Sequence, residues 1–241
     1  MERNLLFKNY ITTQLSHNAN LSTKRIRLEN NTFDRNLSSM LPMSKKAKIL
    51  EIGFGTGLFI KYLLLKGYKN IYGVELSPEE TKFVKKNVYK NVGCVKNTND
   101  FLNKHKGEYD FIFMFDVLEH IPKDKTIDFL VKIRKSLKTE GSFIARVPNA
   151  TNPFNINEFG TDFTHEFIYT PRSLLQVNKI ADFSEINILP FKEENITWHG
   201  RITNITQGLM FFLIRMITVL SRNSLDPKPF YTKNIYCVCK K

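Results

Sequence analysis

The sequence lacks the features that mark secreted and membrane-spanning proteins. Its three cysteines, Cys94, Cys237 and Cys239, are too few for a disulfide framework. No apolar run is long enough to span a bilayer. The stretch from Met1 to Arg25 also has no uninterrupted apolar core of the kind found in secretory signals. We therefore expect a cytoplasmic protein with no transmembrane segment.

Acidic residues are scarce relative to basic ones. The chain has 23 aspartates and glutamates against 36 lysines and arginines, which gives a net charge of +13. Such a charge suits an anionic partner, which would be a nucleic acid, a phosphorylated substrate or a membrane surface. However, the lysines are spread along the chain, which favours a generally basic surface. No basic tract is interleaved with aromatic residues, so we do not expect nucleic-acid binding.

From residue 47 onward, short apolar segments alternate with longer amphipathic ones. We predict one domain over 47–241, preceded by a helical cap over 1–46. In that domain we predict strands over 47–53, 70–76, 93–97, 109–118, 141–149, 183–190 and 234–241. We predict helices over 57–67, 78–90, 100–105, 125–138 and 171–181. The alternation predicts parallel strands joined by right-handed helical crossovers.

Three segments depart from this alternation. The cap is predicted to be helical from the spacing of Leu5, Leu6, Tyr10, Ile11 and Leu15. Residues 148–170 are predicted to form a polar loop that carries aromatic residues, and 191–228 an insertion. The insertion contains an apolar helix, 205–220, which is too short to span a membrane. We expect this helix to be buried against the sheet or a second subunit of a homodimer, with docking on a membrane surface as the alternative.

A glycine-rich turn follows the first predicted strand in the stretch ILEIGFGTG, with glycines at 53, 55 and 57. A phosphate-binding P-loop requires Lys-Ser or Lys-Thr after its last glycine, but Leu58 and Phe59 stand there. The dinucleotide fingerprint requires its third glycine at position 58. The turn therefore predicts close approach of a ligand to the backbone, without the two commonest phosphate-binding patterns.

Two carboxylates narrow the choice of ligand. Glu51 precedes the first glycine, where it would repel a pyrophosphate, and Glu75 ends the next strand, where a carboxylate accepts from ribose hydroxyls. A ligand with a ribose, a cationic end and no phosphate fits this pair better than a dinucleotide does. S-adenosylmethionine, with its sulfonium and ammonium groups, has these properties.

The ordered motifs over residues 47–150 resemble those of class I S-adenosylmethionine-dependent methyltransferases. The motifs are LEIGFGTG, GVELS, NTNDF, YDFIFMFDVLEHIP and LKTEGSFIARVPN. The resemblance implies a Rossmann-like α/β fold with helices on both faces of the sheet. That sheet would have seven mostly parallel strands and an antiparallel last strand, which NIYCVCKK would form. It also implies S-adenosylmethionine as the cofactor and S-adenosylhomocysteine as the product.

The resemblance also assigns roles to individual residues. The glycine turn would hold the amino-acid end of the cofactor, Glu75 the ribose hydroxyls, Asp100 and the Phe101 amide the adenine, and Asp116 the methionyl end. The implied cofactor-binding residues are Glu51, Gly53, Phe54, Gly55, Gly57, Glu75, Leu76, Asn99, Asp100, Phe101, Asp116 and Val117. Glu75 has the alternative of a solvated loop acid, and Asp100 and Asp116 that of helix N-caps.

The loop after the fourth strand bears on the methyl acceptor. It reads DVLEH rather than NPPY, which argues against methylation of a base or amide nitrogen, and it contains no cysteine for attack on a pyrimidine ring. His120 in this loop and His165 in TDFTHEF are candidate catalytic bases. The alternatives are a histidine tied to the backbone at a helix start for His120 and a surface histidine for His165. No residues have metal-ligand spacing, so we predict no metal.

The segments VPNATNPF and DFTHEFIYTPRSL are similar to methyltransferases encoded with bacterial surface-polysaccharide (capsule) genes. This second resemblance implies methyl transfer to an oxygen of a small acceptor, such as a sugar, a nucleotide-linked sugar or a phosphoryl group. Three alternatives stay open: a methyltransferase of a quinone-like lipid precursor, a basic RNA-binding methyltransferase, and a non-catalytic scaffold. The intact glycines, Glu75 and Asp100 argue against the scaffold.

Overall fold

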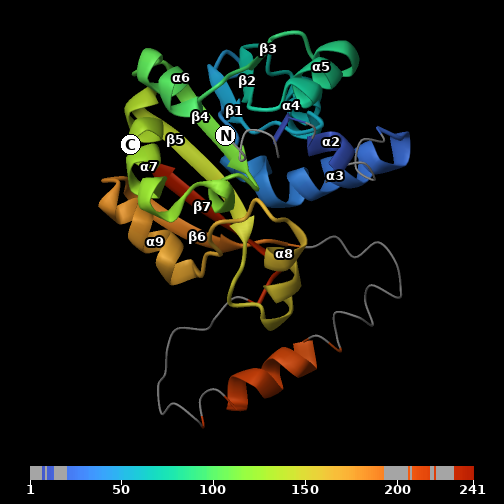
Figure 1. Cartoon of the computed structure of the whole chain (residues 1–241), viewed down its shortest axis with the longest axis vertical. Coiled ribbons are helices and arrows are strands. Elements are labelled where there is room, and N and C mark those ends of the chain that lie inside the picture. Colours follow the sequence, from blue (N-terminus) through green and yellow to red (C-terminus); the bar gives the residue numbers. More distant parts are fainter. Residues whose placement is uncertain are drawn as a thin grey trace.

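The computed structural model describes residues 7–8, 10–13, 21–192, 206, 208–217, 220 and 231–241. Their framework is a seven-stranded sheet in the order β3-β2-β1-β4-β5-β7-β6 (Figure 1). The strands are β1 (Ile49–Ile52), β2 (Ile71–Glu75), β3 (Val92–Cys94), β4 (Tyr109–Phe115), β5 (Leu137–Pro148), β6 (Ser184–Pro190) and β7 (Asn234–Lys240).

The first five strands are parallel to one another, and β7 runs antiparallel to both of its neighbours. This confirms the predicted Rossmann-like sheet with an antiparallel last strand. All four residues of β1 and most of β4 are buried, as required of parallel strands whose two faces are both covered. The carboxyl ends of the parallel strands meet at one edge, so the loops that follow β1, β2, β4 and β5 lie together.

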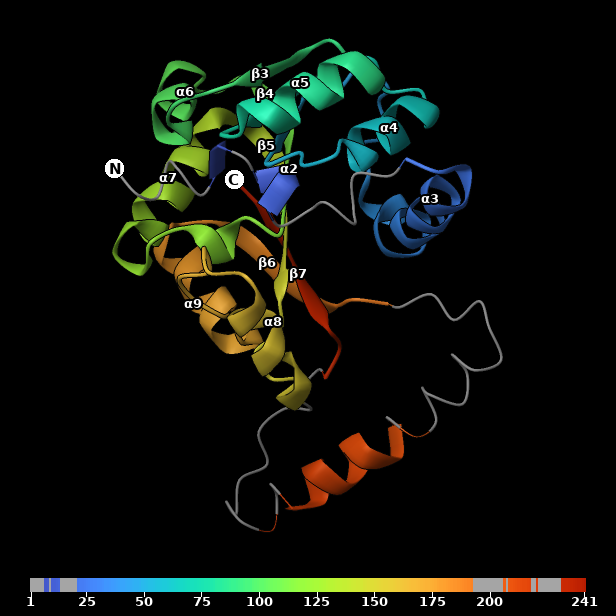
Figure 2. The same cartoon turned by 45° about the vertical axis from the view of Figure 1, so that its right-hand side comes forward.

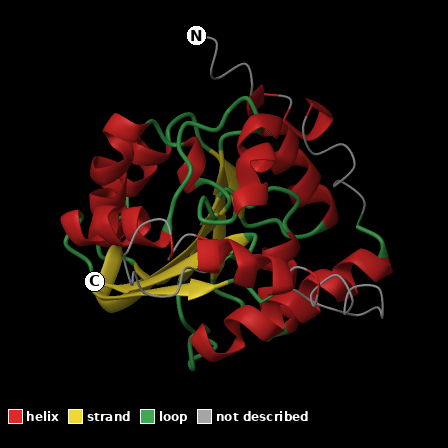
Figure 3. Ribbon diagram, turned by 90° about the horizontal axis from the view of Figure 1, so that it is seen from below, coloured by secondary structure: helices red, strands yellow, loops and turns green. Residues whose placement is uncertain are grey.

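Helices cover both faces of the sheet (Figure 3). On one face, Phe33, Phe59 and Val84 belong to a core cluster with Phe113. On the other face, the core cluster includes Leu102, Phe129 and Leu174. The helices that supply these residues are α3 (Thr23–Leu37), α4 (Leu58–Leu65) and α5 (Pro78–Asn87) on the first face, and α6 (Thr98–Lys104), α7 (Thr126–Ser136) and α9 (Pro171–Ile180) on the second.

The described part of residues 1–46 contains helices, and one of them, α3, packs into the core. Phe33 and Leu37 on α3 are buried. The short helix α2 (Tyr10–Thr13) is attached to α5, because the backbone N–H and hydroxyl of Thr12 donate to the Glu79 carboxylate at 3.2 and 2.6 Å. A turn of 3₁₀ helix, η2 (Ser38–Met40), follows α3. The division at residue 46 stays a prediction, and Leu5, Leu6 and Leu15 lie outside the described residues.

The prediction of an irregular loop over 148–170 is wrong in part. The segment contains the 3₁₀ turn η5 (Pro153–Asn155) and the helix α8 (Ile156–Thr161). Asparagines organise it: the Asn149 side chain accepts from the Thr151 N–H at 3.0 Å, and the Asn155 amide donates to the Asn149 carbonyl at 2.9 Å. Side chains that bond to nearby backbone groups give short turns that hydrophobic periodicity does not reveal.

The apolar helix predicted over 205–220 is present over 208–217, but its expected burial against the sheet is wrong. Leu209, Phe212, Leu213 and Ile217 are each about 60% exposed. Figures 1 and 2 show this helix standing apart from the sheet. Its described aromatic contacts are those of Phe211, which stacks on Tyr231 with ring centroids 4.9 Å apart and lies near Phe154. Within the described ranges, no helix has the length and apolar character needed to cross a membrane.

Candidate active site

The loops at the carboxyl ends of the parallel strands surround a cavity of about 1120 Å³. Its wall takes residues from the turn after β1, the end of β2, the loop after β4 and the end of β5. Most of the predicted site residues line it: Glu51, Gly53, Phe54, Gly55, Glu75, Leu76, Asn99, Asp116, Val117, His120 and His165. The described lining does not include Gly57, Asp100 or Phe101.

The glycine turn after β1 packs closely against the loop after β4 and against α5. Gly53 has a φ of +73°, and a Cβ there would lie 2.2 Å from Val117 Cγ2. Gly57 has a φ of +77° and is the N-cap of α4, where a Cβ would lie 3.0 Å from Val84. Both positions therefore require glycine for conformation and for space. Gly57 acts through the packing of α4 on α5 rather than by lining the cavity.

Glu51 is a buried carboxylate on the cavity wall. The residue is only 3% exposed, and among the described residues its Oε2 atom has no hydrogen-bond partner. Burial, with the nearby Glu75 carboxylate, raises its pKa well above the usual value, although Arg146 opposes the shift. Leaving such an atom without a partner costs free energy, so this position favours a ligand that brings a hydrogen-bond donor or a positive charge.

Glu75 is fixed at the tip of β2 by backbone N–H groups. Its Oε1 accepts from the Leu76 N–H at 2.6 Å, and its Oε2 from the Gly55 N–H at 3.4 Å. Burial raises its pKa, while these N–H donors favour the charged form. A side chain held in this way lines the cavity with a fixed orientation, so the alternative of a solvated loop acid is wrong.

The predicted adenine loop lies at the N-terminus of α6. Its N-cap is Asn97, whose side chain accepts from the Asn99 N–H at 2.8 Å. The alternative that Asp100 is the N-cap is therefore wrong. Asp100 lies exposed in the first turn, and Phe101 stacks on Tyr72 with ring centroids 5.8 Å apart. The fold thus brings Asn99 to the cavity, while the adenine roles of Asp100 and Phe101 stay predictions.

Asp116 stands at the tip of β4 with a φ of +55°. Both of its carboxylate oxygens accept from the Arg146 guanidinium, with Nε 3.1 Å from Oδ1 and a second bond from Nη2 to Oδ2. Val117, not Asp116, is the N-cap of the 3₁₀ turn η3 (Leu118–His120), so the N-cap alternative for Asp116 is wrong. The aspartate places a neutralised ion pair, not a free negative charge, on the cavity wall.

His120 and His165 come together although 44 residues separate them in the sequence. Their ring centroids are 4.7 Å apart. The His120 Nδ1 atom lies 2.7 Å from the Thr164 hydroxyl, and that hydroxyl donates to Asp162 Oδ1 at 2.6 Å. Burial, followed by the effect of His165, lowers the pKa of His120 to about 4, so its ring is neutral near pH 7. The His165 Nδ1 atom is buried, which argues against a surface histidine. A backbone group of Thr164 also bonds the His120 ring, so the backbone-tied alternative for His120 stays open.

Two aromatic residues of the N-terminal segment, Phe7 and Tyr10, cover these histidines. The Tyr10 hydroxyl donates to Asp162 Oδ2. The Phe7 and Tyr10 rings lie edge-on to the His120 ring, with centroids 6.0 and 6.3 Å away. Although burial opposes it, the hydrogen bonds from Thr164 and Tyr10 hold the pKa of Asp162 below its usual value. The carboxylate thus joins Tyr10 to the loop that carries His165.

The sequence and the fold both have matches among known protein families and solved structures. A family model described as a methyltransferase domain matches residues 25–187, which is more than half of the chain. The chain belongs to this family. No curated protein matches the sequence.

Solved structures similar to this methyltransferase share its fold at low sequence identity. An S-adenosylmethionine-dependent methyltransferase from Archaeoglobus fulgidus is 18% identical, with a TM-score of 0.66, over 90% of this chain and 94% of that one. A possible histamine N-methyltransferase from Thermotoga maritima is 16% identical, with a TM-score of 0.64, over 98% and 99%. Phosphoethanolamine N-methyltransferase 2 from Haemonchus contortus is 16% identical, with a TM-score of 0.57, over 98% of this chain and 60% of that one.

The predicted cofactor, S-adenosylmethionine, is confirmed by the family match and by relatives crystallised with it or with S-adenosylhomocysteine. The donor set of this methyltransferase fits it. The unpartnered Glu51 oxygen can accept from an ammonium group, and Glu75 can accept from hydroxyls, at the points where the glycine turn bares the backbone.

Four residues on the methyltransferase's cavity wall escaped the sequence reasoning: Glu80, Glu119, Arg146 and Tyr10. Glu80 is 3% exposed, and burial together with Glu75 raises its pKa to about 9. The sequence indicated this role only weakly, because Glu80 lies in the first turn of α5, the helix that follows β2 and Glu75. Glu119 stood beside His120 in the quoted motif. Arg146 and Tyr10 carried no local signal, because their partners are distant in sequence.

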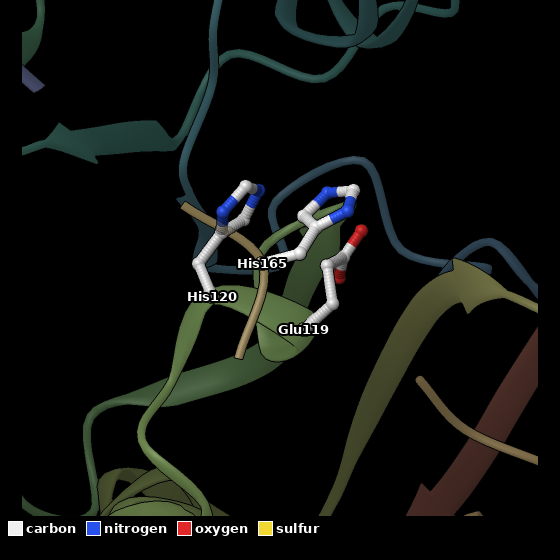
Figure 4. Close-up of side chains that lie close together, drawn as sticks. All are labelled: Glu119, His120 and His165. Atoms are coloured by element: carbon white, nitrogen blue, oxygen red, sulfur yellow. The ribbon is translucent and has the colours of Figure 1, made fainter. Parts of the chain in front are cut away.

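The prediction of no metal rested on the lack of metal-ligand spacing in the sequence. The fold nevertheless brings Glu119, His120 and His165 together, with one ligand atom from each lying within 4.8 Å of the others (Figure 4). Glu119 and His120 are neighbours in the chain, and His165 arrives from a separate loop. Sequence spacing alone therefore gave the wrong reason for excluding a metal.

Proposed function

We propose that this methyltransferase transfers the methyl group to an oxygen of a small carbohydrate-type or phosphoryl-type acceptor, in surface-polysaccharide (capsule) biosynthesis in the cytoplasm. The single observation that carries the proposal is a neutral imidazole, His120, oriented by a buried relay on the wall of the donor cavity. An alcohol must lose a proton when it is methylated, so an oxygen acceptor needs a proton acceptor nearby.

The relay fixes which nitrogen of His120 carries its proton. The Thr164 hydroxyl donates its only proton to the Asp162 carboxylate, so its oxygen accepts from the N–H at Nδ1 of His120. The lone pair of the imidazole is then on Nε2. A histidine held in this tautomer by a hydroxyl and a carboxylate can take a proton from an acceptor hydroxyl, and the carboxylate stabilises the cation that results.

The remaining side chains position the two substrates. When bound, S-adenosylmethionine supplies a methyl group on a positively charged sulfur. Glu51 and Glu75 line the β1 and β2 side of the cavity, where they would hold its ammonium group and its ribose hydroxyls. Phe7 and Tyr10 close the cavity over His120 and reduce its access to water.

Basic side chains on the cavity wall support a phosphorylated acceptor. Arg25, Lys96, Lys125 and Lys233 all line the cavity that holds the acidic donor residues. Cationic groups at a cavity raise the local concentration of anionic substrates. One observation favours the alternative, a quinone-like lipid precursor: the aromatic rings of Phe7, Phe33 and Phe115 line the same cavity and would suit an apolar acceptor.

A direct test is methyl transfer from radiolabelled S-adenosylmethionine to a panel of acceptors. The panel contains nucleotide-linked sugars, sugar phosphates, a polyhydroxylated quinone precursor and RNA, and the position of the label is determined by NMR. The proposal expects label on an oxygen of a sugar or phosphoryl compound. Label on nitrogen or carbon, or transfer only to the quinone precursor or RNA, would overturn it.

We further propose that a second copy of the chain covers the exposed face of the helix at 208–217. Large apolar side chains at Leu209, Phe212 and Leu213 favour an interface over a surface exposed to water. Light scattering should show a dimer that Leu213→Glu converts to a monomer, whereas Ile127→Glu on α7 leaves it unchanged. A monomeric wild-type chain would contradict the proposal.

A further inference from the structure

The cluster of Glu119, His120 and His165 contains oxygen and nitrogen atoms with lone pairs that no described group uses. Glu119 is 1% exposed, yet among the described residues neither of its carboxylate oxygens has a hydrogen-bond partner. The Nδ1 atom of His165 is also buried without a partner there. Figure 4 shows the Glu119 carboxylate turned toward the His165 imidazole. Three unused electron-pair donors that face one another are costly unless something electropositive joins them.

The positive charge that acts on Glu119 is already engaged elsewhere. Among the described residues, Arg146 acts on Glu119 through its charge, but its guanidinium donates to both oxygens of Asp116. The Glu119 carboxylate is buried on the cavity wall. One of its oxygens lies within 4.8 Å of a ring nitrogen from each of His120 and His165.

The relay through Thr164 and Asp162 prepares His120 to act as a ligand. It holds the proton on Nδ1 and leaves the lone pair on Nε2. In metal sites, a ligating histidine commonly donates its other N–H to an oxygen that a carboxylate orients in turn. The same chain of hydrogen bonds that would serve a base therefore also serves a metal ligand.

We propose that Glu119, His120 and His165 bind one divalent first-row transition metal ion, of the type of Mn²⁺, Co²⁺ or Zn²⁺. Two imidazoles and one carboxylate suit ions of this hardness. The ligand atoms lie within 4.8 Å of one another, and atoms bound at about 2.0–2.2 Å to a common ion stand roughly 3 to 4 Å apart. Small side-chain rotations would close the set, and three protein ligands leave positions open.

Glu119, His120 and His165 all line the cavity, which would give the ion a role that rests on the proposed function. A metal ion lowers the pKa of an oxygen that it binds. The acceptor hydroxyl would release its proton to water, and its oxygen would form the new bond to the methyl carbon. The bond from that carbon to the sulfonium sulfur would break, with its electron pair going to sulfur. In this form, His120 holds the ion and does not take the proton.

The first experiment measures metal binding alone, without acceptor. The full chain is stripped with a chelator and titrated with Co²⁺, followed by its visible absorption, and with Zn²⁺ and Mn²⁺ by calorimetry. We expect one equivalent of ion. Glu119→Gln, which keeps the shape of the side chain, and His165→Ala should each weaken binding by more than about tenfold. Circular dichroism checks that both variants are folded.

The chain offers a matched control. His105 and Glu108 also form a histidine–glutamate pair, with Nδ1 3.1 Å from Oε1, about a third exposed and outside the cavity. His105→Ala and Glu108→Gln should leave metal affinity unchanged. If the stripped chain shows no saturable binding, or if folded Glu119→Gln and His165→Ala variants bind the ions as tightly as the wild type, the proposal is overturned.

The proposal and the proposed function fail in different ways. Saturable binding that depends on Glu119 and His165 would uphold the metal site even if no oxygen acceptor is methylated. Oxygen methylation that persists in chelator, together with absent metal binding, would uphold the function and return His120 to the role of base.

Discussion

The two sides of the cavity are built in different ways. The donor side, around Glu51 and Glu75, is made of single short segments at the ends of β1 and β2, fixed by backbone N–H groups. The acceptor side, around His120, is assembled from the N-terminus, the loop after β4 and the loop near residue 164, and is fixed by side chains. The donor side is thus set by local backbone geometry, and the acceptor side by contacts between distant segments.

This difference indicates which side of the cavity tolerates amino-acid substitutions. On the donor side, backbone N–H groups fix the Glu75 carboxylate, so its position depends on the conformation of the turns rather than on other side chains. A site held by Tyr10, Asp162 and Thr164 depends on side chains from segments that can vary independently. We expect substitutions on the donor side to change cofactor affinity, and substitutions on the acceptor side to change turnover while cofactor affinity is retained.

The largest expected effect is that of His120→Ala. Loss of a group that activates the acceptor should lower kcat by about 10²- to 10⁴-fold, with little change in the Kd of S-adenosylmethionine. Single-turnover assays and calorimetry measure the two quantities, and His105→Ala serves as the control. Near-normal turnover would show that His120 neither takes a proton nor holds a group that activates the acceptor.

Glu75→Ala should produce the complementary result. Removal of a fixed carboxylate that accepts from ribose hydroxyls should weaken cofactor binding by about 30- to 100-fold, or ~2–3 kcal/mol. At saturating cofactor, kcat should change far less. Calorimetry measures the affinity, with Glu185→Ala on β6 as the control. An unchanged Kd would remove Glu75 from the donor site.

Glu80→Gln tests the buried acids of the donor side through stability. The pKa of Glu80 is raised from 4.5 to about 9, so between these values the folded chain keeps a proton that the unfolded chain releases. Its contribution to stability is therefore complete below pH 4.5 and is lost as the pH rises toward 9. The variant should lose stability less steeply over this window, by at most ~1.4 kcal/mol per pH unit.

Urea unfolding of the cofactor-free chain at several pH values measures the slope for Glu80→Gln. Glu140→Gln, an exposed position, should retain the wild-type slope. If the two variants behave alike, Glu80 is not a buried neutral acid.

The smallest expected effect is that of Tyr10→Phe. Loss of the hydrogen bond to Asp162 should lower kcat/KM for the acceptor about fivefold, because a net hydrogen bond contributes ~1 kcal/mol. Cofactor affinity should not change. Tyr89→Phe removes a hydroxyl that donates to the Lys69 carbonyl on the surface, and should have no effect. A change in cofactor affinity alone would show that Tyr10 serves the donor side instead.

The sequence predicted the donor-side residues and the two histidines of the acceptor side, but not the contacts that assemble the acceptor side. The strands, Glu51, Glu75 and the glycine turn lie within one stretch whose periodicity and spacing determine their positions. Tyr10 and Asp162 are 152 positions apart, and their contact exists only in the folded chain. The helix at 208–217 shows a further limit, since its composition predicts an apolar helix but not whether this chain covers it.

The contact between Gly53 and Val117 means that the binding sites for the two substrates cannot evolve independently. Val117 follows Asp116 in the loop after β4, and its methyl group fills the space that a side chain at position 53 would need. A bulkier residue at 117, selected to reshape the pocket for a new acceptor, would push on the turn that carries the methyl donor. Directed changes of acceptor preference should therefore accumulate compensating substitutions in the stretch from Glu51 to Gly57.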